Sequence, residues 1–354
     1  MERRERIRGL ILGTAVGDAL GLPAEGIPRL RAHKIFGQEW RHRFLGRWGM
    51  VSDDTEHTLF VAQSLMAHPD SSERFAKRLA WCLRGWLLTL PAGIGMATLR
   101  SILRLWCGIP PHRSGVYSAG NGPAMRSAPI GACFPHDPTR LESFLQASTL
   151  LTHTDPRALI GARAIARLSA WIIAQNADAP PAEAELNTLL VACGEENAEW
   201  QAKIEALLEA LRQDLTVEEF AAGLGLENGV TGYIFHTVPV AVYAWRRHFG
   251  DYRATLAAIL DCGGDTDTTG AIAGALAGAT VGAMGIPADW LSGVREWPRS
   301  LRILCAIADR LTEASETQAP HPPVSYFWPG LFLRNALFLI VVLLHGFRRL
   351  APPY

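Results

Sequence analysis

Two short acidic segments, far apart in the chain, carry the residue types best suited to chemistry. They are Ser52-Asp53-Asp54-Thr55 and Gly263-Gly264-Asp265-Thr266-Asp267-Thr268. If folding brings the two segments together, their four carboxylates repel one another strongly unless cations or protons neutralise them. Every candidate ligand is a hard oxygen, so the expected ions are Mg²⁺ or Mn²⁺, with Ca²⁺ as an alternative and Zn²⁺ disfavoured. Four carboxylates can serve two such ions.

Each segment also has an ordinary structural interpretation. The first can be a helix cap with its first turn, and the second can be a loop that leads into a cap. However, apolar runs flank both segments and would carry them into the interior, where exposed capping residues do not usually lie. The two segments together therefore favour a metal site.

The composition restricts the classes of partner. The chain has 354 residues, of which 49% are hydrophobic, so it can bury a large core. Because 34 basic and 34 acidic residues give a net charge of zero, there is no general electrostatic reason to expect a nucleic-acid or membrane-surface partner. The six cysteines are scattered without a Cys-x-x-Cys pair, which predicts a reducing, cytoplasmic location.

The hydrophobic periodicity predicts an all-α protein. Apolar residues recur at helical spacing in almost every segment, and strand-like alternation is nearly absent. We expect one catalytic domain over residues 1–312, a proline-containing tether over 313–330, and an apolar helix or tail over 331–354. The basic N-terminus, followed by an apolar run, resembles a signal peptide. Because the acids Asp18 and Glu25 follow at once, we do not expect this segment to direct export.

Two segments contain glycines at every fourth position. The glycines are Gly9, Gly13, Gly17 and Gly21 in the first segment, and Gly270, Gly274, Gly278 and Gly282 in the second. Each helical glycine costs about 0.5–1 kcal/mol relative to alanine, so close packing must compensate. We expect two glycine ridges that allow close helix packing; if they pack against each other, Glu25 would lie beside Asp265 and Asp267. Small-residue association in a membrane is the alternative, which the flanking carboxylates disfavour.

The C-terminal apolar segment, residues 331–344, resembles a membrane span at first sight. Arg334 and Asn335 interrupt it, and the run is shorter than the roughly 17–25 residues of a span, so we predict no transmembrane helix. We expect a helix that docks on the body or mediates a dimer, with a peripheral membrane contact as the alternative.

An ordered series of motifs resembles the ADP-ribosylglycohydrolase family, which includes the dinitrogenase reductase-activating glycohydrolases. The resemblance extends from Ile7 to about Leu311. The motifs are Gly17-Asp18-Ala19-Leu20-Gly21 with Glu25, Ser52-Asp53-Asp54-Thr55, Ser118-Ala119-Gly120-Asn121-Gly122 with Met125-Arg126, Thr152-His153, Gly232-Tyr233, and Gly264-Asp265-Thr266-Asp267-Thr268. Their order and spacing make the resemblance specific.

The resemblance implies a compact, orthogonal all-α bundle around a central binuclear Mg²⁺ or Mn²⁺ site. By motif position, the implied metal ligands are Ser52, Asp53, Asp54, Asp265, Asp267 and Thr268. The implied catalytic residues are Glu25, Asp54 and Asp267. The implied substrate contacts are Ser118, Gly120, Asn121, Gly122, His153 and Tyr233.

The implied activity is hydrolysis of the glycosidic bond between ADP-ribose and an acceptor. The three backbone N–H groups of Gly120-Asn121-Gly122 can bind the diphosphate, and Tyr233 can stack on the adenine. Two ions can bind the ribose hydroxyls while Glu25 transfers a proton as the bond breaks through an oxocarbenium-like state. Taken singly, these residues have ordinary alternatives: a plain turn at Asn121, a core ring at Tyr233, a helix cap at His153 and a surface carboxylate at Glu25.

The acceptor is most simply a modified protein side chain, with arginine favoured. Several arginine-directed relatives carry an aspartate in the loop that corresponds to residues 91–98, and this chain has no acid there. This difference weakens the case for arginine. Two other functions stay open: a module that binds ADP-ribose or blocks a partner without turnover, and a metal-dependent phosphatase or amide hydrolase.

Overall fold

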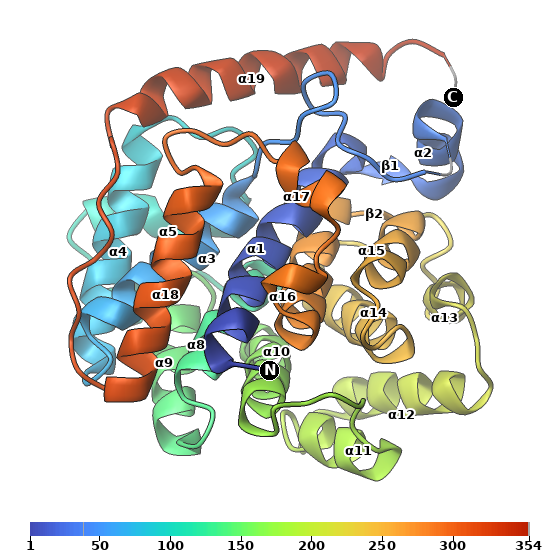
Figure 1. Cartoon of the computed structure of the whole chain (residues 1–354), viewed down its shortest axis with the longest axis horizontal. Coiled ribbons are helices and arrows are strands. Elements are labelled where there is room, and N and C mark those ends of the chain that lie inside the picture. Colours follow the sequence, from blue (N-terminus) through green and yellow to red (C-terminus); the bar gives the residue numbers. More distant parts are fainter. Residues whose placement is uncertain (38, 353–354) are drawn as a thin grey trace.

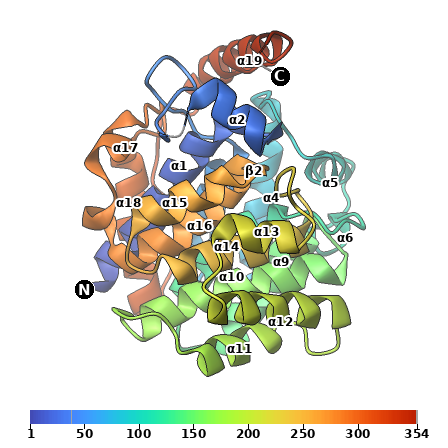
Figure 2. The same ribbon diagram turned by 90° about the vertical axis from the view of Figure 1, so that its right-hand side faces the viewer.

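The computed structural model describes residues 1–37 and 39–352, and this part of the chain is predominantly helical (Figures 1 and 2). It contains nineteen α-helices, two short 3₁₀ helices and two strands of two residues each. The prediction of an all-α fold is therefore confirmed.

The elements follow one another along the chain in the order of their labels. The first half contains α1 (Arg3–Gly21), η1 (Leu22–Ala24), β1 (Ile27–Pro28), α2 (Arg29–Phe36), α3 (Asp53–Ala67), α4 (Ser72–Leu88), α5 (Met96–Trp106), α6 (Pro111–Ser114), α7 (Gly122–Met125), α8 (Ala128–Cys133), α9 (Pro138–Leu150) and α10 (Pro156–Ala174). The second half contains α11 (Glu183–Val191), α12 (Ala198–Arg212), α13 (Val217–Gly223), α14 (Ile234–Arg247), α15 (Tyr252–Asp261), β2 (Gly263–Gly264), α16 (Thr266–Val281), η2 (Ala283–Gly285), α17 (Ala288–Gly293), α18 (Leu301–Thr317) and α19 (Gly330–Arg348).

Helices α1 and α16 form the centre of the fold and pack against each other through their glycines (Figure 1). A Cβ atom added to Gly13 would lie 2.2 Å from the carbonyl oxygen of Gly274, and one added to Gly17 would lie 2.0 Å from that of Gly270. The two helices are antiparallel, because the order of their paired glycines is reversed. The predicted ridges therefore face each other, and the C-terminal end of α1 meets the N-terminal end of α16.

The other helices surround this pair. Helices α3 and α18 pack on α1, α14 and α15 pack on α16, and α10 joins α16 to the layer formed by α7, α8 and α9. One continuous hydrophobic cluster connects them. The apolar glycine helices are consequently core elements. The stretch Arg3–Ala24 is long and apolar enough to cross a membrane, but 94% of its apolar 18-residue portion is buried in the fold.

The C-terminal region differs from our expectation at two points. Helix α18 continues to Thr317, so the connecting segment begins five residues later than the predicted start at residue 313. Helix α18 extends because its last turns still have a buried face, on which Ser315 donates a hydrogen bond to the carbonyl oxygen of Cys133 at 2.9 Å. Helix α19 has 19 residues and is apolar enough to span a membrane by length and composition, so the expectation that this segment is too short was wrong.

Contacts with the body, rather than length, define the position of α19. Arg334 forms an ion pair with Glu296, with Nε 2.8 Å from Oε1 and Nη2 2.9 Å from Oε2. The Asn335 amide donates a hydrogen bond to the carbonyl oxygen of Thr89 at 2.8 Å. The Phe338 ring lies 4.9 Å from the Phe44 ring. The expected docking of this helix on the body is therefore observed.

The glycine contact predicts a specific loss of stability. In Gly13→Ala, the new methyl group would overlap the backbone of α16, so we expect the free energy of unfolding to fall by about 2 kcal/mol or more. Gly85→Ala is the matched control, because Gly85 is also inside a helix but a Cβ there meets nothing within 4 Å. This control should gain about 0.5–1 kcal/mol. Denaturant unfolding measures both changes, and equal effects of the two substitutions would contradict the close-packing interpretation.

Candidate active site

The site forms where the ends of α1 and α16 meet, and backbone hydrogen bonds fix its geometry. Strands β1 and β2 pair antiparallel with Ile27 opposite Gly264. The N–H of Gly26 donates to the carbonyl oxygen of Gly264 at 2.7 Å, and the N–H of Asp265 donates to that of Val230, also at 2.7 Å. These bonds hold the segments that carry Glu25 and Asp265 side by side.

A fourth segment, the loop that contains Asn121, joins the same assembly. The N–H of Asn121 donates to the carbonyl oxygen of Gly232 at 3.0 Å, and the N–H of Ile234 donates to that of Ala119, also at 3.0 Å. Four segments thus meet at one place because a few short backbone pairings connect them, and the two farthest apart in the chain, at Glu25 and Asp265, are separated by 240 positions.

These segments enclose a cavity of about 330 Å³. It is lined by Glu25, Asp53, Gly93, Gly95, Met96, Ala97, Thr98, Ser118, Gly120, Asn121, Gly122, Met125, His153, Gly232, Asp265, Asp267 and Thr268. Most of the predicted site residues are therefore brought together. Ser52 and Asp54 lie behind this lining, and Tyr233 lies beside it.

Asp18 connects α1 to the first acidic segment, although the sequence assigned it no separate role. Its side chain is fully buried. Its carboxylate accepts hydrogen bonds from the backbone N–H of Ser52 at 2.9 Å and from that of Thr55 at 3.1 Å. Asp18 thus caps the first turn of α3, although the two lie 34 positions apart in the sequence. The one feature of the sequence that pointed to a role for Asp18 is the presence of an acid within an apolar, glycine-rich helix.

Asp54 and Asp267, which the acidic motifs predicted to share one pocket, belong to a connected polar cluster. The Thr268 hydroxyl donates to Asp54 Oδ2 at 3.2 Å, and the Ser52 hydroxyl donates to the same oxygen at 3.0 Å. Asp267 accepts the N–H of Thr268 at 2.9 Å. Residues that lie more than two hundred positions apart in the chain are therefore in direct contact.

Asp265 is oriented by the loop residue Asn121. The Asn121 amide nitrogen donates to Asp265 Oδ2 at 2.6 Å and to the hydroxyl oxygen of Thr237 at 3.0 Å. The backbone N–H of Asn121 is already used by Gly232, and the N–H of Gly120 donates to the Ser118 hydroxyl at 3.3 Å. Two of the three N–H groups that we expected to bind phosphate are therefore committed within the protein.

The crowding of carboxylates changes their acidity. Burial, together with the charges of Asp18 and Glu25, raises the pKa of Asp53 to about 8. Burial and the neighbouring carboxylates raise the pKa of Asp54 and of Asp267 well above the usual value. Burial also raises the pKa of Asp18 to about 6, although its four hydrogen bonds oppose the shift. Each of these charges would be stabilised by a cation.

The donor set fits divalent ions, although the side chains do not already form a coordination shell. Within residues 1–37 and 39–352, no three Asp, Glu, His or Cys side chains are grouped closely enough to hold an ion as they stand. Hydrogen bonds with Thr268 and Asn121 hold Asp54 and Asp265 in their present orientation. However, Asp54 Oδ1 is buried without a hydrogen-bond partner, which is the kind of oxygen atom that a hard cation can satisfy.

Glu25 lies at the mouth of the cavity with an exposed side chain. Partial withdrawal from water and the charge of Asp265 raise the pKa of Glu25, and the cation of Arg349 opposes the shift. Arg349 follows α19 and donates a hydrogen bond to the carbonyl oxygen of Pro23 at 3.2 Å. The C-terminal segment therefore places a cation near the proposed proton-transfer residue, a contact that the sequence did not reveal.

His153 is held as a neutral, oriented ring on the floor of the cavity. Burial and the cation of Arg126 lower the pKa of His153 to about 3. Its Nδ1 lies 2.8 Å from the Thr152 hydroxyl, which also accepts a hydrogen bond from the buried Arg126 guanidinium at 2.6 Å. A Cβ on Gly122 would lie 3.1 Å from this ring, which explains why the loop is built from glycines at this point.

Tyr233 is positioned by charged neighbours. Its hydroxyl donates to the Glu199 carboxylate at 2.9 Å and accepts a hydrogen bond from Arg157 at 3.3 Å. The Arg157 guanidinium also lies over the ring, 5.6 Å from its centre. Tyr233 is thus a partly exposed ring next to the cavity, and its role as an adenine contact stays a prediction.

The loop at residues 91–98 covers one side of the acidic cavity. Gly93, Gly95, Met96, Ala97 and Thr98 all belong to its lining. None of these residues carries a charge, so this wall contrasts with the acidic wall formed by Asp53, Asp265 and Asp267.

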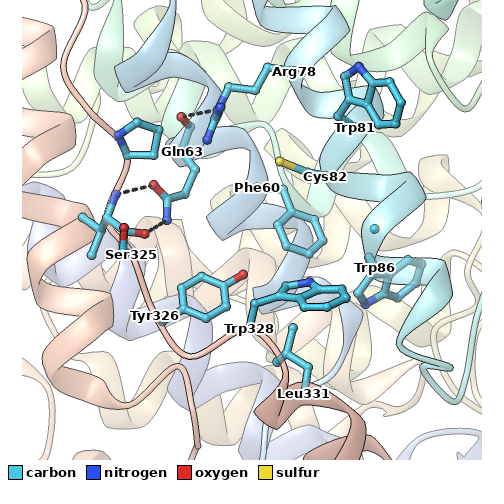
Figure 3. A pocket seen from close by; sticks show the side chains of 13 residues that line it. Phe60, Gln63, Arg78, Trp81, Cys82, Trp86, Ser325, Tyr326, Trp328 and Leu331 are labelled. Atoms are coloured by element: carbon cyan, nitrogen blue, oxygen red, sulfur yellow. Dashed lines mark hydrogen bonds between the residues drawn. The ribbon is translucent and has the colours of Figure 1, made fainter.

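A second, larger cavity of about 580 Å³ has a different chemical character (Figure 3). Aromatic side chains, among them Trp86, Tyr326 and Trp328, line it together with Arg78. None of its lining residues is acidic. It therefore lacks the carboxylates that line the first cavity.

Comparisons with known proteins agree with this geometry. The sequence profile of the ADP-ribosylglycohydrolase family matches residues 1–321. An uncharacterised protein of Archaeoglobus fulgidus is 31% identical over 307 residues, with 82% of this chain and 92% of the relative covered. The ADP-ribosyl-[dinitrogen reductase] glycohydrolase of Rhodospirillum rubrum is 29% identical, with 86% and 97% covered.

Two further comparisons extend the relationship. The ADP-ribosylhydrolase ARH3 of Xenopus tropicalis is 28% identical, with 80% of this chain and 89% of the relative covered. A solved structure described as an ADP-ribosylglycohydrolase-related protein complex superposes with a TM-score of 0.63 at 27% identity, with 89% of this chain and 99% of that chain covered. The chain therefore belongs to the ADP-ribosylglycohydrolase family and is a hydrolase that acts on ADP-ribose glycosidic linkages.

Proposed function

We propose that this enzyme removes ADP-ribose from a modified protein side chain in a reaction that depends on two Mg²⁺ or Mn²⁺ ions. The observation that carries the proposal is the meeting of the two acidic segments at one cavity, where Thr268 contacts Asp54. The proposed ligands are Ser52, Asp53, Asp54, Asp265, Asp267 and Thr268. When bound, the ions would neutralise these carboxylates and offer Lewis-acid sites for the paired ribose hydroxyls.

The other residues of the site have distinct tasks in this proposal. Ser118 and Gly122 line the side of the cavity where the diphosphate would lie, and the neutral His153 ring can hydrogen-bond a phosphate or ribose oxygen without adding charge. Asn121 holds Asp265 in position. Glu25 transfers the proton that the leaving group gains or that the attacking water loses as the bond to C1 of the ribose breaks.

The acceptor would lie against the uncharged wall at residues 91–98. This wall offers no negative charge to stabilise a cationic guanidinium, although the nearby carboxylate of Glu25 can attract one. We keep arginine as the first acceptor to test and serine as the second. The six cysteines are all free, which supports our proposal of a reducing, cytoplasmic location.

The first prediction concerns activity and metal dependence. Purified enzyme should release free ADP-ribose from ADP-ribosyl-arginine or ADP-ribosyl-serine substrates, lose this activity in a chelator, and regain it with Mg²⁺ or Mn²⁺. Asp267→Asn should lower kcat/KM by at least about a hundredfold, since it removes one proposed ligand. Asp289→Asn is the control, because its carboxylate is 64% exposed on the surface.

Different products would identify the alternatives. Tight binding of ADP-ribose without turnover would show a binding module, and release of phosphate or ammonia would show a different hydrolase. Activity that survives complete chelation would contradict the metal proposal while leaving the glycosidic chemistry in place.

The second prediction isolates the role of Glu25. Glu25→Gln keeps the shape of the side chain but cannot transfer a proton, so kcat should fall by about 10² to 10⁴. Calorimetric affinity for ADP-ribose should change little. The control Glu227→Gln alters another exposed glutamate and should leave both quantities unchanged. A parallel loss of affinity and rate would instead assign Glu25 to binding.

The third prediction concerns stability and pH. Since the folded-state pKa of Asp53 is about 8 and its unfolded-state value is 3.8, the folded chain binds the extra proton between these values. The metal-free protein should therefore lose stability as the pH rises through this window. Asp53→Asn should lose less between about pH 5 and pH 8.

Metal binding should reverse this loss. Mg²⁺ should raise the Tm of the wild type more at pH 8 than at pH 5, because protons compete with the ion at the lower pH. Differential scanning calorimetry with and without chelator measures both effects. Equal pH slopes for wild type and Asp53→Asn would contradict the assignment.

A further inference from the structure

From Phe332 to Phe347, every exposed side chain of α19 is apolar, and only Arg348 in its last turn is exposed and charged. The large apolar side chains, which form the outward face of α19, are Phe332, Leu333, Leu337, Leu339, Ile340, Leu343, Leu344 and Phe347, each at least 43% exposed. Their spacing places them on one side of the helix, opposite the residues that contact the body. Exposed apolar residues on ordinary protein surfaces are scattered singly, whereas these form one continuous surface along the helix, as at interaction sites.

The polarity of α19 is the reverse of that in an ordinary surface helix. Apart from Arg348 in the last turn, its polar residues face the protein. Arg334 is 5% exposed and paired with Glu296, and Asn335 is 2% exposed and bonded to Thr89. His345 Nε2 lies 2.9 Å from the carbonyl oxygen of Phe44. A surface helix in water shows polar residues outward, whereas polar groups that point inward behind an apolar exterior are typical of surfaces in contact with lipid.

Neighbouring residues continue this apolar surface beyond the helix. A shallow hollow of about 190 Å³ lies between α19 and the loop before α3, and Leu333, Leu337, Trp48 and Trp297 line it. The two tryptophans are 47% and 50% exposed. Tryptophan is enriched where proteins meet the headgroup region of a bilayer.

The charges around this surface are basic. The sequence contains no acidic residue after Glu316, so the last 38 positions, including all of α19, carry no carboxylate side chain. Exposed arginines lie near the apolar surface: Arg47 next to Trp48, Arg295 in the lining of the hollow, and Arg348 at the end of α19. The zero net charge of the chain conceals this local asymmetry, so it does not exclude a membrane surface as a partner.

We propose that the outward face of α19 docks on the surface of a bilayer that contains anionic phospholipid, with the helix in the plane of the interface. Apolar residues would enter the boundary between headgroups and acyl chains, and the arginines would contact anionic headgroups. Figure 1 shows α19 along the edge of the molecule, and Figure 2 shows it at the periphery of the bundle, so a flat surface can contact its whole length.

Two other occupants fit the contacts less well. A membrane-spanning orientation would break the bonds of Arg334 with Glu296 and of Asn335 with Thr89, and would expose these groups to hydrocarbon. A second copy of α19 brings no acid to meet the arginines, because α19 contains none. Anionic lipid satisfies both the apolar face and the charge.

Vesicle co-sedimentation of the full-length enzyme tests the proposal. We expect at least about tenfold stronger binding to vesicles of phosphatidylcholine with phosphatidylglycerol than to phosphatidylcholine alone, and weaker binding as salt rises. Ile340→Glu with Leu344→Glu should abolish the binding. Leu103→Glu with Met284→Glu is the matched control, because it adds the same charge at residues that are 50% and 90% exposed elsewhere.

The control should bind like the wild type, and circular dichroism and thermal unfolding confirm that both variants fold. Equal binding to neutral and anionic vesicles, or none to either, would overturn the proposal. A wild-type dimer in light scattering that Ile340→Glu with Leu344→Glu dissociates would assign the face to a second copy. Vesicle-bound protein that resists alkaline extraction would assign α19 as a span. Hydrolysis assays without vesicles judge the proposed function separately.

Discussion

The close contact of α1 and α16 is the constraint on which the rest of the structure depends. Glycines line both helices, and a Cβ atom at Gly9, Gly13 or Gly17 would fall within 2.2 Å of a facing carbonyl oxygen. Because the helices are antiparallel, this contact brings the end of α1 to the start of α16. Asp18 and Asp267 therefore come near each other, and β1 and β2 pair just beyond the contact. The glycines thus set the position of the catalytic chemistry as well as the packing of the core.

This position concentrates negative charge, and the fold balances the charge by several different means. Backbone N–H groups at the start of α3 satisfy Asp18, hydroxyl groups of Ser52 and Thr268 satisfy one oxygen of Asp54, and the Asn121 amide satisfies Asp265. The negative charge that these hydrogen bonds leave uncompensated raises the pKa of Asp53 and of Asp54, and one buried oxygen of Asp54 has no hydrogen-bond partner. Buried carboxylates whose charge is only partly compensated reduce the stability of the fold, and such a cost is common at functional sites.

The sequence predicted the features that depend on local spacing. Glycines four apart predicted the ridges, and the acidic motifs predicted that Asp53, Asp265 and Asp267 would share one cavity, because both patterns lie within short segments of sequence. It did not reveal the cap that Asp18 provides, since the partner N–H groups lie 34 positions away and are chosen by the fold. The sequence also placed the start of the connecting segment too early, at residue 313. Helix α18 continues to Thr317 because small residues such as Ala314 and Ser315 are buried within an otherwise polar stretch. The reversed polarity of α19 required the docked structure, because an apolar sequence does not show which face is covered.

The C-terminal segment lies beyond residue 321, where the match to the family profile ends, yet it contacts the same part of the site. Its helix carries the apolar surface, and Arg349 at its end bonds to Pro23, two residues before Glu25. The cation opposes the rise in the pKa of Glu25 that partial withdrawal from water and the charge of Asp265 cause. A displacement of α19 would therefore also change the charge environment of Glu25, the proposed proton-transfer residue. The region that matches the family profile and a surface outside it are in this way joined by one electrostatic contact.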